Sequence, residues 1–269
     1  MRAMFPRGLR LAVACLLVAA ALPARAGAAT VLLEALTSTE LSAMVREGHT
    51  TIIVPIGGTE QNGAHMALGK HNRRVALLAE KIALALGNAL VAPVIAYVPE
   101  GDVDPPTAHM RYAGTVTLPS ATFVRTLEAA GQSFRRHGFR DVVFLGDHGG
   151  YQQDLRRAAE LLNRAWSALP ARAHAVPEYY RAVDVGFPEL LRRQGFADAE
   201  IGRHAGLADT ALMLALDPSY VRIDRLQSAP PPGSVAGDPR RADARTGALG
   251  VDLIVAATVR AIRRAESRP

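Results

Sequence analysis

The chain has 269 residues, of which 49% are hydrophobic and only one is a cysteine. A chain of this length can bury a substantial core as one large domain, and its composition excludes a disordered or fibrous protein. The formal net charge is +6, but four arginines and no acidic residue fall within the first 26 residues, which leaves +2 for the remainder. That balance gives little support for a nucleic-acid-binding protein.

The first 26 residues have the pattern of a secretory signal peptide. Three arginines precede an uncharged apolar run over residues 11–22, and the tripeptide Ala24-Arg25-Ala26 has the small-x-small form that signal peptidase recognises. We therefore expect an exported protein, periplasmic or secreted, with no membrane attachment after cleavage; an uncleaved N-terminal anchor is the alternative. The single cysteine, Cys15, lies in this segment. The rest of the chain can therefore hold a metal only through His, Asp, Glu or Asn.

Strand and helix patterns alternate from residue 51 onward. Apolar or β-branched runs predict strands, and apolar residues at a helical period predict helices. In chain order the predicted elements are a strand over 51–56, a helix over 71–86, a strand over 89–93, a helix over 120–138 with Ser120 as its N-cap, a strand over 141–145, a helix over 152–166, a strand over 171–176, and helices over 209–216 and 249–264. This alternation predicts one domain over residues 27–269, a three-layer α/β/α sandwich around a mostly parallel sheet.

Two loops and a set of arginine pairs complete the pattern. Residues 97–114 and 228–236 are rich in Pro and Gly, and we expect them to shape a pocket.

Five arginine pairs fall in helical patterns, and we interpret them as solvated helix faces. They are Arg73-Arg74, Arg135-Arg136, Arg156-Arg157, Arg192-Arg193 and Arg263-Arg264. No aromatic interleaving accompanies them, so we predict no nucleic-acid partner.

Three polar clusters follow predicted strands or open predicted helices. They are residues 60–65 (EQNGAH) with His71, residues 147–150 (DHGG), and residues 204–209 (HAGLAD). Ligands bind beyond the C-terminal ends of the strands in an open parallel sheet, so the clusters can converge there. Carboxylates and imidazoles without thiols suit a catalytic Zn, Mn, Fe or Co ion. Each residue alone also has a structural interpretation; Asp209, for example, fits the N-cap of a helix over 210–216.

Taken together, these segments resemble the creatininase (creatinine amidohydrolase) family. The matching segments are 55–71 (PIGGTEQNGAHMALGKH), 109–115 (HMRYAGT), 136–139 (RHGF), 146–151 (GDHGGY), 204–210 (HAGLADT) and 237–239 (GDP). The resemblance covers residues 34 to 264 in the family's order. It implies a three-layer α/β fold, a metal centre that is usually binuclear, hydrolysis of a C–N bond in a cyclic or linear amide, and a homo-oligomer, often a hexamer.

The chain departs from the family's metal ligands at several positions. The resemblance implies that Glu60 and His148 keep their ligand roles, that Asn62 replaces a histidine, and that His71 replaces the aspartate that bridges two metals. Asp209 stands where the family has a glutamate. A neutral imidazole normally binds one metal, so we expect one ion per chain held by Glu60, His71 and His148, with Asp209 as a fourth ligand or general base. Zinc is the first expectation, with Mn, Fe or Co as alternatives.

The resemblance also implies roles for residues around the ion. His204 matches a family histidine that exchanges protons with the scissile amide, so we predict His204 and Asp209 as catalytic residues. The residues expected to contact substrate are Asn62, His65, His109, Gly149 and Gly150.

The predicted function is therefore that of an exported, metal-dependent amidohydrolase. Its expected substrate is a small cyclic or linear amide or a short peptide, cleaved at a C–N bond by metal-activated water. The alternative is a catalytically inactive periplasmic binding or scaffold protein that keeps the fold, because fold similarity alone does not guarantee activity.

Overall fold

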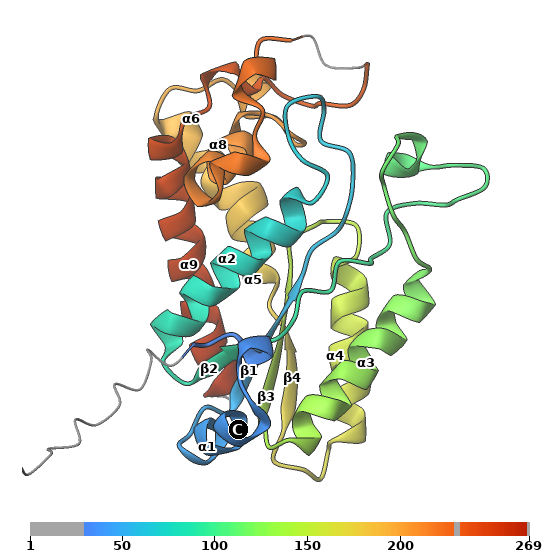
Figure 1. The fold of residues 1–269 in the computed structure, drawn as a ribbon, viewed down its shortest axis with the longest axis vertical. Helices are drawn as coiled ribbons and strands as arrows, with labels where there is room; N and C mark the ends of the chain where they lie inside the picture. The colour runs from blue at the N-terminus through green and yellow to red at the C-terminus, as the bar shows by residue number, and fades with distance from the viewer. Residues whose placement is uncertain (1–29, 229–231, 268–269) are drawn as a thin grey trace, which may run out of the picture.

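The computed structural model describes residues 30–228 and 232–267 (Figure 1). The predicted signal peptide, with Cys15, lies outside the described residues, as does part of the predicted loop 228–236. No helix in the described ranges has the length and apolar character that crossing a membrane requires.

The centre of the fold is a parallel sheet with the strand order β2-β1-β3-β4. Its strands are β1 (Thr51–Ile56), β2 (Ala89–Val91), β3 (Asp141–Gly146) and β4 (Arg172–Ala175). β1 is buried along its whole length, as expected for a central strand covered on both faces. The four predicted strands are confirmed, with β2 and β4 shorter than expected.

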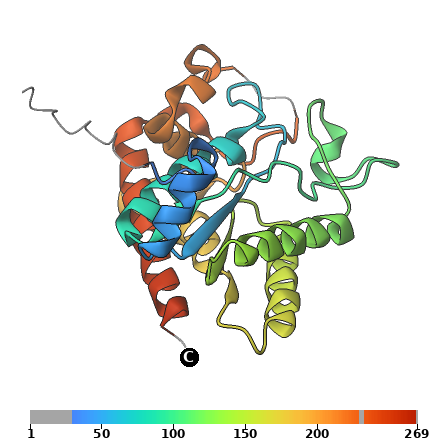
Figure 2. The same ribbon diagram turned by 60° about the horizontal axis from the view of Figure 1, so that its bottom comes forward.

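Helices cover both faces of the sheet, and the three-layer α/β/α sandwich is confirmed (Figures 1 and 2). One core cluster joins the sheet to α2 (Lys70–Leu86), α8 (Leu207–Leu216) and α9 (Ala244–Glu266). The other joins it to α3 (Ser120–Arg136) and α4 (Gln152–Ala165). The apolar stripes of α2, α3 and α4 therefore face the sheet, while α8 and α9 pack on each other and on α2.

Several shorter elements were not predicted from the sequence. They are α1 (Ser38–Arg46), which begins at a capping box of Thr37 and Glu40, then α5 (Pro177–Arg181), the π-helical turn Ala182–Gly186, α6 (Phe187–Arg193), α7 (Asp198–Ile201), and 3-10 turns that include Ala108–Arg111. The capping-box pattern of Thr37 and Glu40 was visible in the sequence.

Three predicted helix starts need correction. α3 begins at Ser120 itself, with Pro119 as its N-cap. α8 begins at Leu207, so Asp209 lies in its first turn and is not an N-cap. α9 begins at Ala244, earlier than expected, because the Asp243 side chain accepts a hydrogen bond from the backbone of Thr246 and caps the helix.

The packing of α9 against α8 is unusually close at one point. A Cβ atom placed on Gly247 would lie 1.8 Å from the carbonyl oxygen of Ala211 in α8. Glycine therefore sets the separation of these two helices, and α8 carries Asp209 toward the site.

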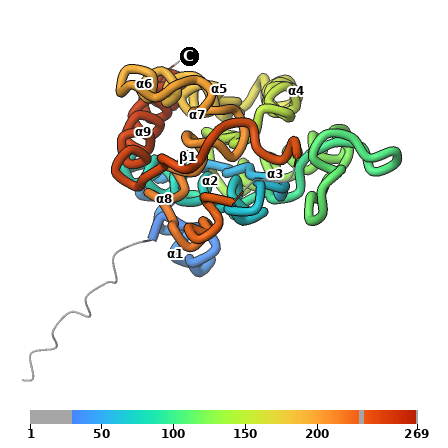
Figure 3. Tube along the Cα trace, turned by 90° about the horizontal axis from the view of Figure 1, so that it is seen from above, coloured from blue at the N-terminus to red at the C-terminus, as the bar shows by residue number. Residues whose placement is uncertain are grey.

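The C-terminal ends of β1 and β3 open at one edge of the sheet. The start of α2, the start of α8 and the loop that follows β1 gather there, while the segment over residues 97–118 extends to one side (Figure 3). This edge is where an open parallel sheet binds ligands.

Candidate metal centre and active site

Glu60 is the centre of the site. It follows β1, has no solvent exposure, and one of its carboxylate oxygens, Oε2, has no hydrogen-bond partner among the described residues. Four imidazoles surround it: Oε1 lies 2.7 Å from His71 Nε2 and 3.6 Å from His204 Nδ1, and Oε2 lies 3.1 Å from His109 Nε2 and 3.7 Å from His148 Nε2. A buried carboxylate oxygen without a hydrogen bond calls for an explanation, and a bound ion is one.

Two overlapping groups of side chains have the geometry to hold a metal ion. Glu60, His71 and His148 form one, and Glu60, His109 and His204 form the other, with ligand atoms within 4.8 Å of one another in each group. Ligands about 2.1 Å from a tetrahedral ion lie roughly 3.4 Å apart, and the four imidazoles lie 2.7–3.7 Å from the Glu60 oxygens. The structure thus brings together the three residues predicted as ligands, and it adds a second group that was not predicted.

The His71 ring is held between two carboxylates. Its Nδ1 lies 2.6 Å from Asp147 Oδ2, opposite the contact of Nε2 with Glu60. Burial and the Lys70 ammonium lower the pKa of His71, but Glu60 and Asp147 outweigh them and the net pKa is raised. A carboxylate behind a histidine orients the ring and increases its basicity as a metal ligand. Asp147 therefore fixes the direction of Nε2.

A buried ionic network extends from Asp147. Arg74 Nε lies 2.9 Å from Asp147 Oδ2, and Arg74 Nη1 lies 2.6 Å from Asp209 Oδ1. Tyr179 donates its hydroxyl to Asp147 Oδ1 at 2.6 Å, and Lys70 Nζ lies 3.1 Å from Asp209 Oδ2. The interpretation of the Arg73-Arg74 pair as a solvated face was wrong for Arg74, whose side chain is only 1% exposed, because two carboxylates from distant segments pair with it.

Asp209 belongs to this network and lies outside both metal-ligand groups. Burial raises the pKa of Asp209, but Lys70 and Arg74 outweigh burial and hold the pKa well below its usual range. Its Oδ2 also accepts the backbone N–H of Ala205. Its role as fourth ligand or base stays a prediction; its contacts favour an anchor for two cations.

His204 and His109 face Glu60 from the opposite side to His71. His204 Nε2 lies 3.0 Å from the Gln61 carbonyl oxygen, an acceptor, and 3.1 Å from the Gln61 side-chain nitrogen, a donor, while Nδ1 faces Glu60. Burial and Lys70 outweigh Glu60 and lower the pKa of His204 to about 4. The Gln61 side-chain amide lies 3.3 Å from His109 Nδ1. His204 is thus a neutral proton acceptor in this arrangement.

His148 follows β3 and has a second carboxylate nearby. Burial and His71 lower the pKa of His148 to about 3. Glu100 Oε2 lies 3.7 Å from His148 Nδ1. Glu100 is 3% exposed, and burial followed by the charge of Glu60 raises its pKa to about 8. Glu100 was not singled out from the sequence, where it lay within a segment interpreted only as a loop.

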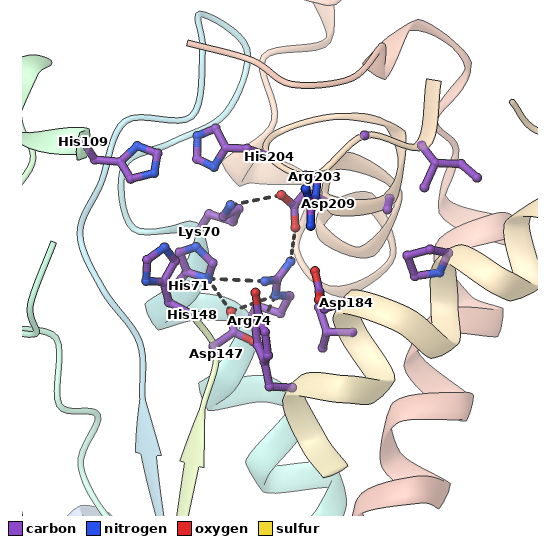
Figure 4. A pocket seen from close by; sticks show the side chains of 16 residues that line it. Lys70, His71, Arg74, His109, Asp147, His148, Asp184, Arg203, His204 and Asp209 are labelled. Atoms are coloured by element: carbon purple, nitrogen blue, oxygen red, sulfur yellow. Dashed lines mark hydrogen bonds and ion pairs between the residues drawn. The ribbon is translucent and has the colours of Figure 1, made fainter. Parts of the chain in front are cut away.

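These groups line a pocket of about 150 Å³ (Figure 4). Its walls include Lys70, His71, His109, His148 and His204, and its outer part includes Tyr180, Asp184, Pro188 and Arg203. The pocket is small and its lining is mixed, with charged and imidazole side chains beside Val183, Ile201 and Ala208, as suits a small substrate.

Of the residues expected to contact substrate, His109 lines this pocket. Asn62 instead donates its side-chain amide to the carbonyls of Glu60 and Ala67 and so braces the loop. His65 is 3% exposed and bonds to Thr210, and it lines a separate pocket. Gly149 and Gly150 lie outside the lining, although the backbone N–H of Gly150 faces His148 Nδ1 at 3.3 Å. For these four residues, the placement gives no support for substrate contact.

Lys70, Arg74, Asp147 and Glu100 were missed as site residues. The spacing of Lys70, His71 and Arg74 places them on one face of the first turns of α2, which is a helical pattern readable in the sequence. Asp147 directly follows β3 and precedes His148, so its position also indicated the site.

Comparisons with known proteins identify the family of the chain. The family model for creatininase, described as creatinine amidohydrolase, matches residues 34–262. The creatinine amidohydrolase of Pseudomonas putida is 28% identical over 199 residues, which are 73% of this chain and 75% of that protein. The mycofactocin precursor peptide peptidase of Mycolicibacterium smegmatis is 29% identical over 195 residues, 71% of this chain and 66% of that protein.

Solved structures show the same fold. A creatinine amidohydrolase (creatininase) structure matches with a TM-score of 0.75 at 23% identity, covering 90% of this chain and all of the other. A structure described as creatininase Mn matches with a TM-score of 0.75 at 25% identity, covering 89% of this chain and 100% of the other. The chain belongs to the creatininase family of metal-dependent amidohydrolases.

Proposed function

We propose that this protein hydrolyses a C–N bond in a small cyclic or linear amide or a short peptide, with one divalent ion held by Glu60, His71 and His148. The observation that carries the proposal is the convergence of these three ligands within 4.8 Å of one another, around a carboxylate oxygen that has no hydrogen bond among the described residues.

The donor set fits a divalent first-row ion. One carboxylate and two imidazoles leave a tetrahedral ion with an open position, which is the arrangement of catalytic zinc sites. Related structures are described as a Zn-Zn type and as Mn forms of creatininase, and zinc is our first choice for this chain. A divalent ion at such a site lowers the pKa of a bound water and polarises a carbonyl.

The residues around the ion have distinct tasks in this proposal. Asp147 orients His71, and Asp209 holds Lys70 and Arg74. His204 is neutral and its Nδ1 faces Glu60, so in this proposal the ring accepts a proton from the attacking water and returns it to the departing nitrogen. The water oxygen ends in the new carboxyl group, the C–N bond breaks, the amine leaves with the transferred proton, and the second water proton passes from the carboxyl group to solvent.

The pocket and the relatives support a small substrate. The pocket measures about 150 Å³ and is lined mainly by charged and imidazole side chains. The relatives are described as acting on creatinine and on a precursor peptide. Arg203 and Asp184 at the outer part of the pocket offer one charge of each sign to a polar substrate. We further propose that the protein works outside the cytoplasm, as a homo-oligomer.

The proposal is tested by metal analysis and a substrate screen on the purified protein. We expect about one equivalent of zinc or a similar ion per chain, together with hydrolysis of at least one amide from a panel of lactams, cyclic ureides, N-acyl amines and short peptides. Glu60→Ala removes both. A folded protein that binds no divalent ion and hydrolyses no amide would instead support an inactive binding protein.

A further inference from the structure

Lys70 is a buried cation inside the pocket. It is the first residue of α2, its side chain is 1% exposed, and it lines the pocket between His71 and His204 (Figure 4). Its Nζ lies 3.1 Å from Asp209 Oδ2 and 3.6 Å from Glu60 Oε1. Lysine is almost never buried this fully unless it is paired, and here a metal-ligand carboxylate is one of its two neighbours.

The charges around the pocket match one divalent ion. Among the described residues, four carboxyl groups (Glu60, Glu100, Asp147 and Asp209) and two cationic side chains (Lys70 and Arg74) surround the cluster, and Asp184 and Arg203 in the pocket lining add one charge of each sign. One divalent ion brings the cluster within one charge of neutrality whether Glu100 is ionised or protonated. A second divalent ion would leave an excess of at least two positive charges in a buried site, which is strongly unfavourable.

We propose that Lys70 is a catalytic residue that takes the place of a second metal ion, an inference that rests on the proposed amide hydrolysis. Its ammonium donates a hydrogen bond to the carbonyl oxygen of the amide and stabilises the negative charge that develops there. When water adds to the carbonyl carbon, the electron pair of the C=O bond moves to this oxygen. The pair returns as the C–N bond breaks, and no covalent bond to Lys70 forms.

The hydrogen bonds of Lys70 leave it free for this task. An ammonium has three donors. Asp209 accepts one at 3.1 Å, while Glu60 at 3.6 Å lies beyond hydrogen-bond distance. Asp209 fixes the ammonium from one side, so the remaining N–H groups can face the pocket. Donors fixed in advance where charge develops supply a large share of enzymatic rate enhancement.

A structural role and a catalytic role for Lys70 predict opposite effects on metal binding. If Lys70 only stabilised the pocket, its loss would weaken both ion binding and the reaction. In the catalytic role, the ammonium repels the ion that shares Glu60 with it. Removing it should therefore tighten ion binding while it slows the reaction.

The test compares the full-length wild-type chain with Lys70→Met and Lys81→Met. Lys81 lies on the same helix and is exposed, so it is the matched control. Zn²⁺ affinity is measured against a competing chelator, and kcat and KM are measured on the best substrate from the screen. For Lys70→Met we expect about tenfold tighter Zn²⁺ binding and a kcat that is about 10²–10³-fold lower with little change in KM. Lys81→Met should match the wild type.

Several results would overturn the inference. Unchanged or weaker Zn²⁺ binding by folded Lys70→Met assigns the residue a structural role, and an unchanged kcat removes its catalytic role. Two tightly bound equivalents of Zn²⁺ in the wild type refute the charge argument. If Lys70→Met does not fold, Lys70→Arg is used, and loss of Zn²⁺ binding in that charge-preserving variant counts against the proposal. A wild type that binds no ion or hydrolyses no amide refutes the proposed function itself, which is a different outcome.

Discussion

The two histidine pairs on either side of Glu60 differ in what lies behind each ring. His71 has the Asp147 carboxylate on its outer nitrogen, whereas the outer nitrogen of His148 accepts the backbone N–H of Gly150 and has the Glu100 carboxyl group 3.7 Å away. His204 Nε2 instead lies beside the backbone carbonyl and the side-chain amide of Gln61, and the same amide lies behind His109. We call His71 and His148 the inner wall, and His204 and His109 the outer wall.

This difference assigns different chemistry to rings of the same type. A carboxylate behind a ring favours a cation in front of it, which suits a metal ligand. A neutral partner leaves an imidazole whose proton can be gained and lost, which suits proton transfer. The tests below change one wall, or the residues that support it, at a time.

The largest effect is expected from Glu60, which both walls share. Glu60→Ala removes the only carboxylate in either metal-ligand group of the described residues, so the ion is lost. We expect kcat/KM to fall by about 10³-fold or more, since the ion supplies most of the polarisation. Metal content and kinetics measure this, with the exposed Glu189→Ala as control. If Glu60→Ala keeps its ion, Glu60 is not a metal ligand.

A large loss of stability is expected from Arg74, which supports the inner wall through Asp147. Arg74→Met leaves Asp147 and part of Asp209 unpaired in a buried setting, so we expect the free energy of unfolding to fall by about 3–5 kcal/mol. Urea unfolding followed by circular dichroism measures the change.

The neighbouring Arg73 is a matched control for this variant. Its ion pair with Asp217 is 2.6 Å long, but its side chain is 41% exposed, so Arg73→Met should change stability by less than about 1 kcal/mol. Equal effects of the two substitutions would contradict the buried network.

The outer wall should affect rate without affecting metal content. His204→Ala removes the proposed proton carrier, and we expect kcat to fall by about 10²–10³-fold while the equivalent of metal is retained. His71→Ala differs from His204→Ala, because it should lose the metal together with the activity. Metal analysis beside kcat separates the two, and loss of the metal from His204→Ala would assign the ion to the outer wall.

The smallest effect is expected from His109, which lies on a 3-10 turn and is 25% exposed. His109→Ala should leave metal content unchanged and lower kcat/KM by about tenfold or less, mainly through KM, because one polar contact to substrate is lost. Steady-state kinetics measure it. A hundredfold fall in kcat would show that His109 acts in the chemical step.

Local patterns in the sequence were sufficient for the strands and for much of the site. The apolar run of β1 and the glycines that follow it predicted the place of Glu60, and the end of β3 predicted that of His148. The resemblance to the creatininase family supplied the ligand set, including His71. These features depend on residues close together in the chain or on motifs of fixed spacing.

The ionic network could not be predicted in the same way. Arg74 pairs with Asp147 across 73 positions and with Asp209 across 135 positions, and the spacing that places Arg74 on the face of Lys70 does not identify these distant partners. Only the packing of α2 against β3 and α8 decides which arginine is buried. The same reason explains why Asp209 was interpreted as a cap or a ligand and not as a partner of Lys70.

The close contact of α9 with α8 at Gly247 has a consequence for the width of the pocket. α8 carries Asp209, and Asp209 holds Lys70. The separation between α9 and α8 therefore determines how far the Lys70 ammonium reaches toward the substrate. The C-terminal helix therefore works as a spacer for a site it does not touch. A single added methyl group at Gly247 would lengthen that spacing, so this position connects the end of the chain to substrate fit.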